Sequence, residues 1–122
     1  MGLLLSGTLL LSLGIFEIVY IDRSAKHILS QISLLAAAAE KADWPDVERE
    51  LTRLEADWNR TSDKWTVFLH HSEIDMLSMS VARAGGFAKT RSRDLLLSEV
   101  VSMKTIVAHI PDLERVTLSN IF

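Results

Sequence analysis

The side chains best suited to chemistry lie close together near the middle of the chain. His70, His71, Glu73 and Asp75 form the main cluster of ligand-type residues, and histidine with nearby carboxylates can hold a divalent metal. His71 and Asp75 are four residues apart, which places them on one face of a helix. The spacing is nonspecific, because metalloprotease sites need two histidines four apart with a glutamate after the first. The alternative is a helix start, in which Ser72 and Asp75 form a capping box and His71 bonds a backbone carbonyl. We predict the helix start and no bound metal or cofactor, and keep His71, Glu73 and Asp75 as the metal-binding alternative.

Other catalytic arrangements lack a supporting motif. The sequence has no cysteine, which excludes thiol catalysis, zinc ribbons and iron–sulfur clusters. It contains no glycine-rich phosphate loop and no motif typical of a serine, histidine and acid triad. His27 and His109 are single histidines, and a structural role at a helix end explains them. We therefore expect no enzymatic activity.

Length and composition limit the class of protein. The chain has 122 residues, of which 48% are hydrophobic and 24% charged, with a formal net charge of −3. This length suits one small domain, and a mean hydropathy of +0.21 is high for a fully soluble one. The mild acidity excludes a strong general attraction to nucleic acid.

The apolar excess lies at the start of the chain. Residues 2–16 carry no charged side chain, and the apolar run resumes after Glu17 over residues 18–21. A helix over residues 2–21 would be about 30 Å long, which matches the bilayer core. Glu17 lies near the end of this segment, where Tyr20 could mark the interface and the carboxylate could reach water. Pairing of Glu17 with a polar group on a partner helix is the alternative. We predict a transmembrane anchor that contacts the lipid bilayer through residues 2–21.

A cleaved signal peptide is the competing interpretation of this segment. No Lys or Arg precedes the apolar run, and no small-x-small cleavage site follows it, since the next residues are Asp22, Arg23, Ser24, Ala25 and Lys26. These two features favour a retained anchor.

The rest of the chain has helical periodicity. Over residues 25–42, apolar side chains recur at steps of three and four, so the anchor helix is expected to continue outward. Asp43 and Pro45 predict a new helix, with Asp43 as N-cap and Pro45 in the first turn. An apolar stripe with the same spacing follows at Trp44, Val47, Leu51, Leu54, Trp58, Thr61, Trp65 and Phe68.

Two more helices are expected after this stripe. The third begins at the Ser72 capping box, and Gly85 and Gly86 end or bend it. The fourth runs from about Asp94 to residue 109, where Pro111 stops it. The predicted fold is all-α: an N-terminal transmembrane helix continues into a small bundle of antiparallel helical hairpins. The predicted units are the anchor at residues 1–21, the bundle at 22–110 and a tail at 111–122 that docks on the bundle.

Two groups of residues are candidates for partner binding. The three tryptophans fit a core, but an exposed one would border a groove suited to a peptide or helix. Residues 83–122 contain six basic and four acidic side chains, whereas residues 22–82 contain seven basic and eleven acidic ones. The basic side chains either contact anionic lipid headgroups or an acidic partner, or form a solvated loop. Nucleic acid is not expected, because no aromatic residues interleave with them. The candidates are Trp44, Trp58, Trp65, Arg83, Lys89, Arg91 and Arg93.

Five local patterns together resemble a known family over nearly the whole chain. They are Asp43-Trp44, Trp58 with Trp65, the run from His71 to Asp75, Ala82-Arg83, and the ending from His109-Ile110-Pro111 through Leu118 to Phe122. This combination resembles the bacterial domain of unknown function 4363 family. The resemblance implies a small protein with an N-terminal hydrophobic anchor followed by helices, and it implies no established activity. The chain departs from the family pattern in having Gly85-Gly86 in a usually helical stretch and no basic residues ahead of the anchor.

Two indications of membrane orientation oppose each other. Arg23 and Lys26 follow the anchor, which favours a cytoplasmic helical domain by the positive-inside bias. The resemblance implies basic N-termini and therefore a domain outside the cytoplasm, which we adopt as the expectation for this single-pass protein. The expected function is noncatalytic interaction or scaffolding with an unknown protein partner, and self-association stays open. The alternative is a metal- or ligand-binding sensor subunit of an envelope assembly.

Overall fold

The structure, a computed structural model, describes the backbone of residues 2–121 and the side chains of residues 2–111. It contains four helices in chain order: α1 (Gly2–Glu40), α2 (Trp44–Trp65), α3 (His71–Lys89) and α4 (Arg93–Ile121). They pack as a bundle, which confirms the predicted all-α fold.

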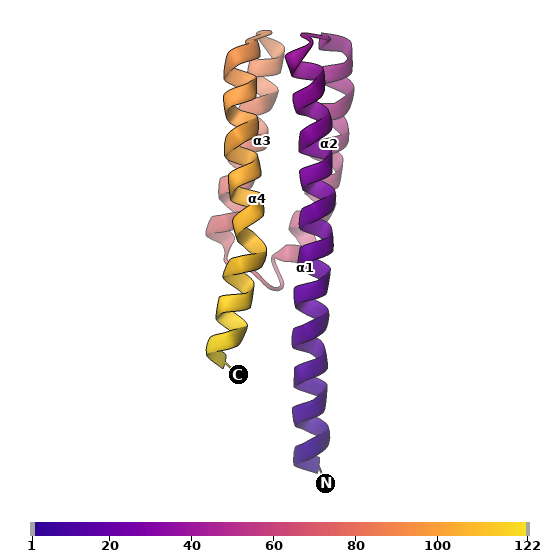
Figure 1. Ribbon diagram of the computed structural model, residues 1–122, viewed down its shortest axis with the longest axis vertical. Coiled ribbons are helices and arrows are strands. Elements are labelled where there is room, and N and C mark those ends of the chain that lie inside the picture. Colours follow the sequence, from indigo (N-terminus) through magenta and orange to yellow (C-terminus); the bar gives the residue numbers. More distant parts are fainter. Residues whose placement is uncertain (1, 122) are drawn as a thin grey trace.

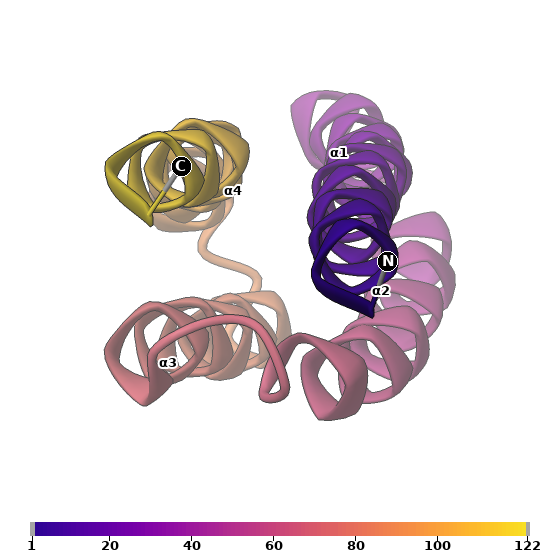
Figure 2. The ribbon, with the colours of Figure 1, turned by 90° about the horizontal axis from the view of Figure 1, so that it is seen from below.

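The helices run up and down around one core (Figure 1). Each helix contacts the next in the chain, and α4 closes the ring by packing on α1. Viewed from below, the four helices enclose a common centre (Figure 2). The α1–α2 and α3–α4 turns lie at one end of the bundle, and the α2–α3 turn lies at the other end, from which α1 projects (Figure 1). We call these the distal end and the anchor end.

Helix α1 combines two environments in one uninterrupted element. Its N-terminal half is exposed, whereas its second half places a stripe of apolar side chains in the core. The stripe has the three- and four-residue spacing of a helix face that packs on neighbouring helices. It consists of Ile21, Ala25, Ile28, Ile32, Leu35, Ala38 and Ala39. The expected continuation of the anchor helix into the bundle is therefore confirmed.

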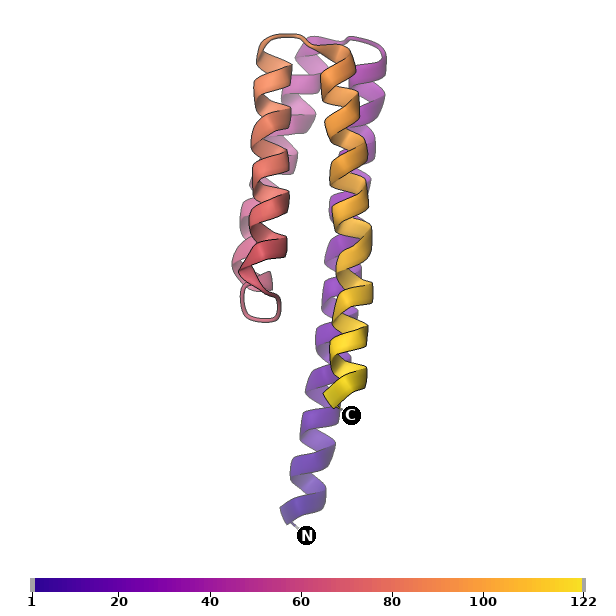
Figure 3. The ribbon, with the colours of Figure 1, turned by 90° about the vertical axis from the view of Figure 1, so that its left-hand side faces the viewer.

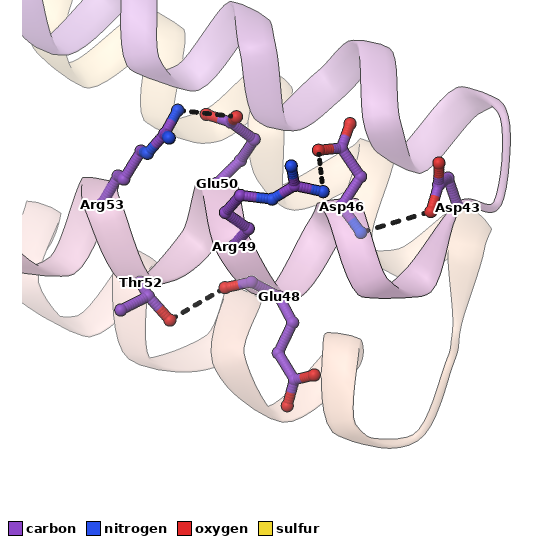
Figure 4. Close-up of polar contacts among 7 residues, drawn as sticks. All are labelled: Asp43, Asp46, Glu48, Arg49, Glu50, Thr52 and Arg53. Atoms are coloured by element: carbon purple, nitrogen blue, oxygen red, sulfur yellow. Dashed lines mark hydrogen bonds and ion pairs between the residues drawn. The ribbon is translucent and has the colours of Figure 1, made fainter.

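The start of α2 follows the sequence prediction. The Asp43 carboxylate accepts a hydrogen bond from the Asp46 backbone N–H at 3.2 Å, and Pro45 lies in the first turn. Figure 4 shows this cap beside the Arg49–Asp46 ion pair. The cap satisfies one of the N–H groups that a helix start leaves free.

The predicted capping box at the start of α3 is wrong. The helix already begins at His71, and its N-cap residue, His70, makes no side-chain cap hydrogen bond. Ser72 lies inside the first turn and its hydroxyl donates to the Glu73 carboxylate at 3.1 Å. The half-buried side chains of Phe68 and Leu69 pack on the core just before this point. We attribute the start of α3 at His71 to these contacts, because they fix the position of the chain before it reaches Ser72.

The predicted helix stop at Pro111 is also wrong, and Gly85 and Gly86 do not end the third helix. Gly85 and Gly86 lie inside α3, which continues to Lys89, and the chain turns only at Arg91, whose φ is 53°. Pro111 lies inside α4, which continues to Ile121. Glycine and proline weaken a helix by about 1 and about 3 kcal/mol relative to alanine. Packing offsets these costs, because Val81 and Ala84 before the glycines are buried, as are side chains of α4 up to Pro111. The expected docking of the tail lies outside the described side chains.

Candidate functional site

The exposed half of α1 carries most of the exposed large hydrophobic side chains among the described residues. Among residues 2–121, one helix is long and apolar enough to cross a membrane, and only 6% of its apolar window is buried. A core helix of a soluble protein would bury most of such a window. The large exposed side chains there are Leu3, Leu4, Leu5, Leu9, Leu10, Leu11, Leu13, Ile15, Phe16 and Val19. This surface fits a membrane anchor or a signal sequence.

The candidate metal ligands do not converge. His71 and Asp75 are exposed, and Glu73 is half-buried beside Ser72. Over the described part of the chain, no three His, Asp or Glu side chains come together in a group that could hold a metal ion. The metal-binding alternative therefore has no assembled site among these residues.

His27, which lies outside the candidate metal ligands, makes a contact that the sequence did not suggest. The Nε2 atom of His27 lies 3.1 Å from Asp57 Oδ2, and Arg60 also pairs with Asp57. With Tyr20 and Lys64, these side chains line a small cavity of about 170 Å³ near the anchor end. His27 and Asp57 are 30 residues apart in the chain, so no local pattern links them.

Two of the three candidate tryptophans belong to the core. Trp58 and Trp65 are buried and their rings meet edge to face, with centroids 5.5 Å apart. The indole N–H of Trp58 donates to Ser78 Oγ at 2.9 Å, and that of Trp65 donates to Ser24 Oγ at 2.8 Å. Their polar atoms are thus satisfied inside the fold, which leaves Trp44 as the tryptophan at the surface.

Trp44 borders a groove of about 640 Å³ between α2 and α3 at the distal end. These two helices make the least extensive contact of the four neighbouring pairs. Gly85 forms part of the floor, because a Cβ there would lie 3.5 Å from the Glu55 carboxylate. The lining residues are Trp44, Pro45, Val47, Glu48, Leu51, Thr52, Glu55, Gly85, Gly86, Ala88, Lys89 and Arg91.

Charges of opposite sign line the two walls of this groove. Glu48 and Glu55 come from α2, whereas Lys89 and Arg91 come from the end of α3 and the following turn. Among residues 2–111, none of these four side chains makes an ion pair. Figure 4 shows the Glu48 carboxylate directed away from the paired residues around it. The groove therefore offers four uncommitted charges around an apolar floor.

The other two basic candidates have partners within the fold. Arg93 bonds the Glu40 carbonyl oxygen at 3.1 Å and pairs with Asp94. Arg83 donates a hydrogen bond from Nε to Glu99 Oε1 at 3.0 Å, and its Nη2 atom forms an ion pair with the same oxygen at 2.9 Å. The basic residues 83–93 thus do not form one patch; they divide between structural pairs and the groove.

Glu99 is the centre of a buried polar network that sequence reasoning missed. Its Oε1 atom accepts from Ser80 Oγ at 2.6 Å as well as from Arg83. Burial raises the pKa of Glu99. The hydrogen bonds from Arg83 and Ser80 and the charge of Arg83 together lower the pKa by more than burial raises it, so the net shift is downward. An acidic residue in the apolar pattern of the fourth helix was the available signal. The network joins α3 to α4 and carries no catalytic arrangement.

With this geometry in place, the chain can be compared with known proteins. The family model described as a domain of unknown function, DUF4363, matches residues 15–121. The chain belongs to the DUF4363 family. The match includes all four core-forming segments and the last part of the anchor, and it confirms the resemblance seen in the sequence. No curated protein and no solved structure matches the DUF4363 chain.

Proposed function

We propose that this DUF4363 protein is a single-pass membrane protein whose helical bundle stands on the bilayer as a noncatalytic interaction module. The observation that carries the proposal is the continuity of α1. One helix runs from an apolar segment with almost no burial into a fully buried core stripe. Such a helix couples the bundle rigidly to the membrane, because no flexible linker separates them.

The packing around residues 14–21 supports a retained anchor over a cleaved signal. Gly14 and Ile21 are buried and Ile18 and Tyr20 are half-buried, so one face of this stretch packs on the fold, while Ile15, Phe16 and Val19 remain exposed. Figure 3 shows the end of α4 reaching past the α2–α3 turn along α1. Cleavage near residue 21 would remove these buried and half-buried residues of α1 from the fold.

We place the bundle on the extracytoplasmic side, in line with the basic N-termini that the family resemblance implies. Two cations, Arg23 and Lys26, follow the span, which argues for the opposite side by the positive-inside bias. A direct measurement of topology decides between them.

The experiment uses the full-length chain with a C-terminal tag, membrane fractionation, and protease treatment of intact spheroplasts. Retention in the membrane with loss of the tag is expected. Retention with a protected tag would overturn the extracytoplasmic orientation. Release into the soluble fraction would overturn the anchor.

The partner site in this proposal is the groove beside Trp44, and the partner is a helical segment of another protein. An amphipathic helix would cover the apolar floor, and its own charges would pair with the acidic wall at Glu48 and the basic wall at Lys89. The groove lies at the distal end, so a bound partner would not meet the membrane.

A matched pair of threonines tests the groove. Thr52 lines it, whereas Thr105 is an exposed residue of α4, and each hydroxyl bonds the carbonyl four residues earlier in its helix. We expect a photoreactive amino acid at position 52 to form a discrete adduct in cells, and Gly86→Leu, which fills the groove, to abolish it. Equal adducts at positions 52 and 105 would refute a groove-specific partner. Adducts with a second copy of the chain alone would replace the partner protein by self-association.

A further inference from the structure

We propose that the α2–α3 turn, residues 66–70, is a second membrane contact that dips into the bilayer interface beside the anchor. This inference rests on the proposed anchor, because the anchor sets the height of the membrane. The evidence is a continuous apolar path from α1 to the turn, an exposed apolar side chain at its tip, and a backbone that satisfies its own hydrogen bonds.

Three aromatic rings join the anchor to the turn. Phe16 is exposed on the anchor and stacks on Tyr20, with ring centroids 6.3 Å apart. Tyr20 in turn contacts Phe68 of the α2–α3 turn, with centroids 6.2 Å apart. Aromatic residues concentrate at the membrane–water interface, where their apolar rings lie near the headgroups. If residues 2–21 span the bilayer, Tyr20 lies at that interface, and Phe68 lies at the same height.

The tip of the turn is apolar toward solvent. Val67 is 77% exposed, although burial of a valine side chain away from water is favourable. The half-buried Phe68 and Leu69 follow Val67 in the chain and pack on the core at the anchor end. Val67 directly precedes Phe68, whose ring contacts Tyr20 of α1, so lipid that covers the anchor at this height would reach Val67 as well.

The backbone of the turn suits an environment poor in water. The N–H groups of residues 66–69 all donate to carbonyl oxygens within the turn or the end of α2, at 2.8–3.3 Å. Unpaired backbone groups are costly in a bilayer, and their internal pairing removes that cost. The Lys64 side chain lines the neighbouring cavity with Tyr20, and a lysine at this height can extend its ammonium group to the headgroups.

These observations favour a bilayer over a protein as the occupant. The apolar tip is small and continuous with the anchor surface, whereas a protein interface would need a larger patch. The charged residues around the turn are of both signs, so we expect the contact to be apolar and to occur on zwitterionic lipid. Two contacts would hold the bundle upright on the membrane, because a single helix allows the domain to tilt.

The absence of cysteine from the sequence allows a direct test with the full-length protein. Single-cysteine variants Val67→Cys, Lys41→Cys and Leu10→Cys would carry an environment-sensitive fluorophore, in nanodiscs of phosphatidylcholine with and without brominated acyl chains. All three positions are exposed, so the label should not disturb the core. Position 41 lies in the turn at the distal end, and position 10 lies within the anchor.

The labels at positions 67 and 10 should be blue-shifted and lose intensity with brominated lipid, and the label at position 41 should show neither change. If the label at position 10 is quenched but the label at position 67 shows no more shift or quenching than the label at position 41, the membrane contact is overturned and the anchor is left intact. A blue-shifted position 67 that bromine does not quench would mean contact with protein, and would also overturn the inference. An unquenched position 10 would refute the anchor itself, and with it the proposed function.

Discussion

Replacing Arg83 with methionine tests whether the Glu99 network stabilises the bundle through charge. Arg83 supplies one of the two hydrogen bonds to Glu99 Oε1, through Nε, and also forms an ion pair with it through Nη2; Ser80 supplies the other hydrogen bond. Methionine keeps the apolar stem of the arginine side chain but removes its charge and its donors. The side chain of Glu99, of which 11% is exposed, would then retain one hydrogen bond from a neutral hydroxyl.

The expected loss of stability at pH 7 is about 2–3 kcal/mol. A hydrogen bond to a charged group contributes about 1.5–3 kcal/mol. The hydrogen bond and the ion pair from Arg83 act on the same oxygen of Glu99, so their contributions are not additive. Breaking a fully buried ion pair costs about 3–5 kcal/mol. The Arg83 side chain is 48% exposed, so water screens the pair and the loss should fall below that range.

The loss should shrink as the pH falls. The folded-state pKa of Glu99 is lowered, so the network contributes stability above the unfolded pKa of about 4.3, and this contribution is lost as pH falls through the folded pKa. In Arg83→Met, burial would raise the pKa of Glu99 without the opposing guanidinium. Protonation at about pH 4 would then relieve the buried charge in the variant, so the two proteins should become closer in stability.

Urea unfolding of the full chain in detergent micelles measures this difference, with the fluorescence of the buried Trp58 and Trp65 as the signal. Arg49→Met is the matched control, because Arg49 forms an exposed pair with Asp46 at 3.0 Å and should cost less than about 0.5 kcal/mol. An Arg83→Met loss of equal size at pH 7 and pH 4 would refute the electrostatic argument. So would a loss no larger than that of Arg49→Met.

Three further substitutions test other parts of the fold by the same unfolding assay. Gly86→Ala should stabilise the protein by about 0.5–1 kcal/mol, because Gly86 lies inside α3 with nothing within 4 Å of an added Cβ; a loss of stability would contradict the helical environment. Ser24→Ala should cost about 1–3 kcal/mol, because it leaves the buried Trp65 indole N–H unpaired. Trp65→Phe should then cost less stability in the Ser24→Ala variant than in the parent protein. Asp43→Ala should cost about 1 kcal/mol through loss of the α2 cap, whereas Asp43→Asn should retain most of the stability.

Local sequence patterns predicted much of this fold. The period of the apolar stripes located all four helices, because burial on one helix face leaves a repeat of three and four residues. Asp43 and Pro45 located the start of α2, since an N-cap is a contact between near neighbours in the chain. The length of the apolar run at residues 2–21 indicated a segment able to cross a membrane, and most of that segment is exposed along α1. Each of these features depends on residues within a few turns of one another.

The tertiary structure decided where helices end and which side chains face solvent. Gly85, Gly86 and Pro111 are helix breakers by propensity, yet packing against neighbouring helices carries α3 and α4 through them. The same packing distinguishes the tryptophans, which lie on one apolar stripe in the sequence but have different surroundings in the bundle. The partners of Trp65 and Glu99 lie 41 and 19 residues away in the chain. Contacts at such separations arise only when helices align side by side, and a single local pattern carries no information about that alignment.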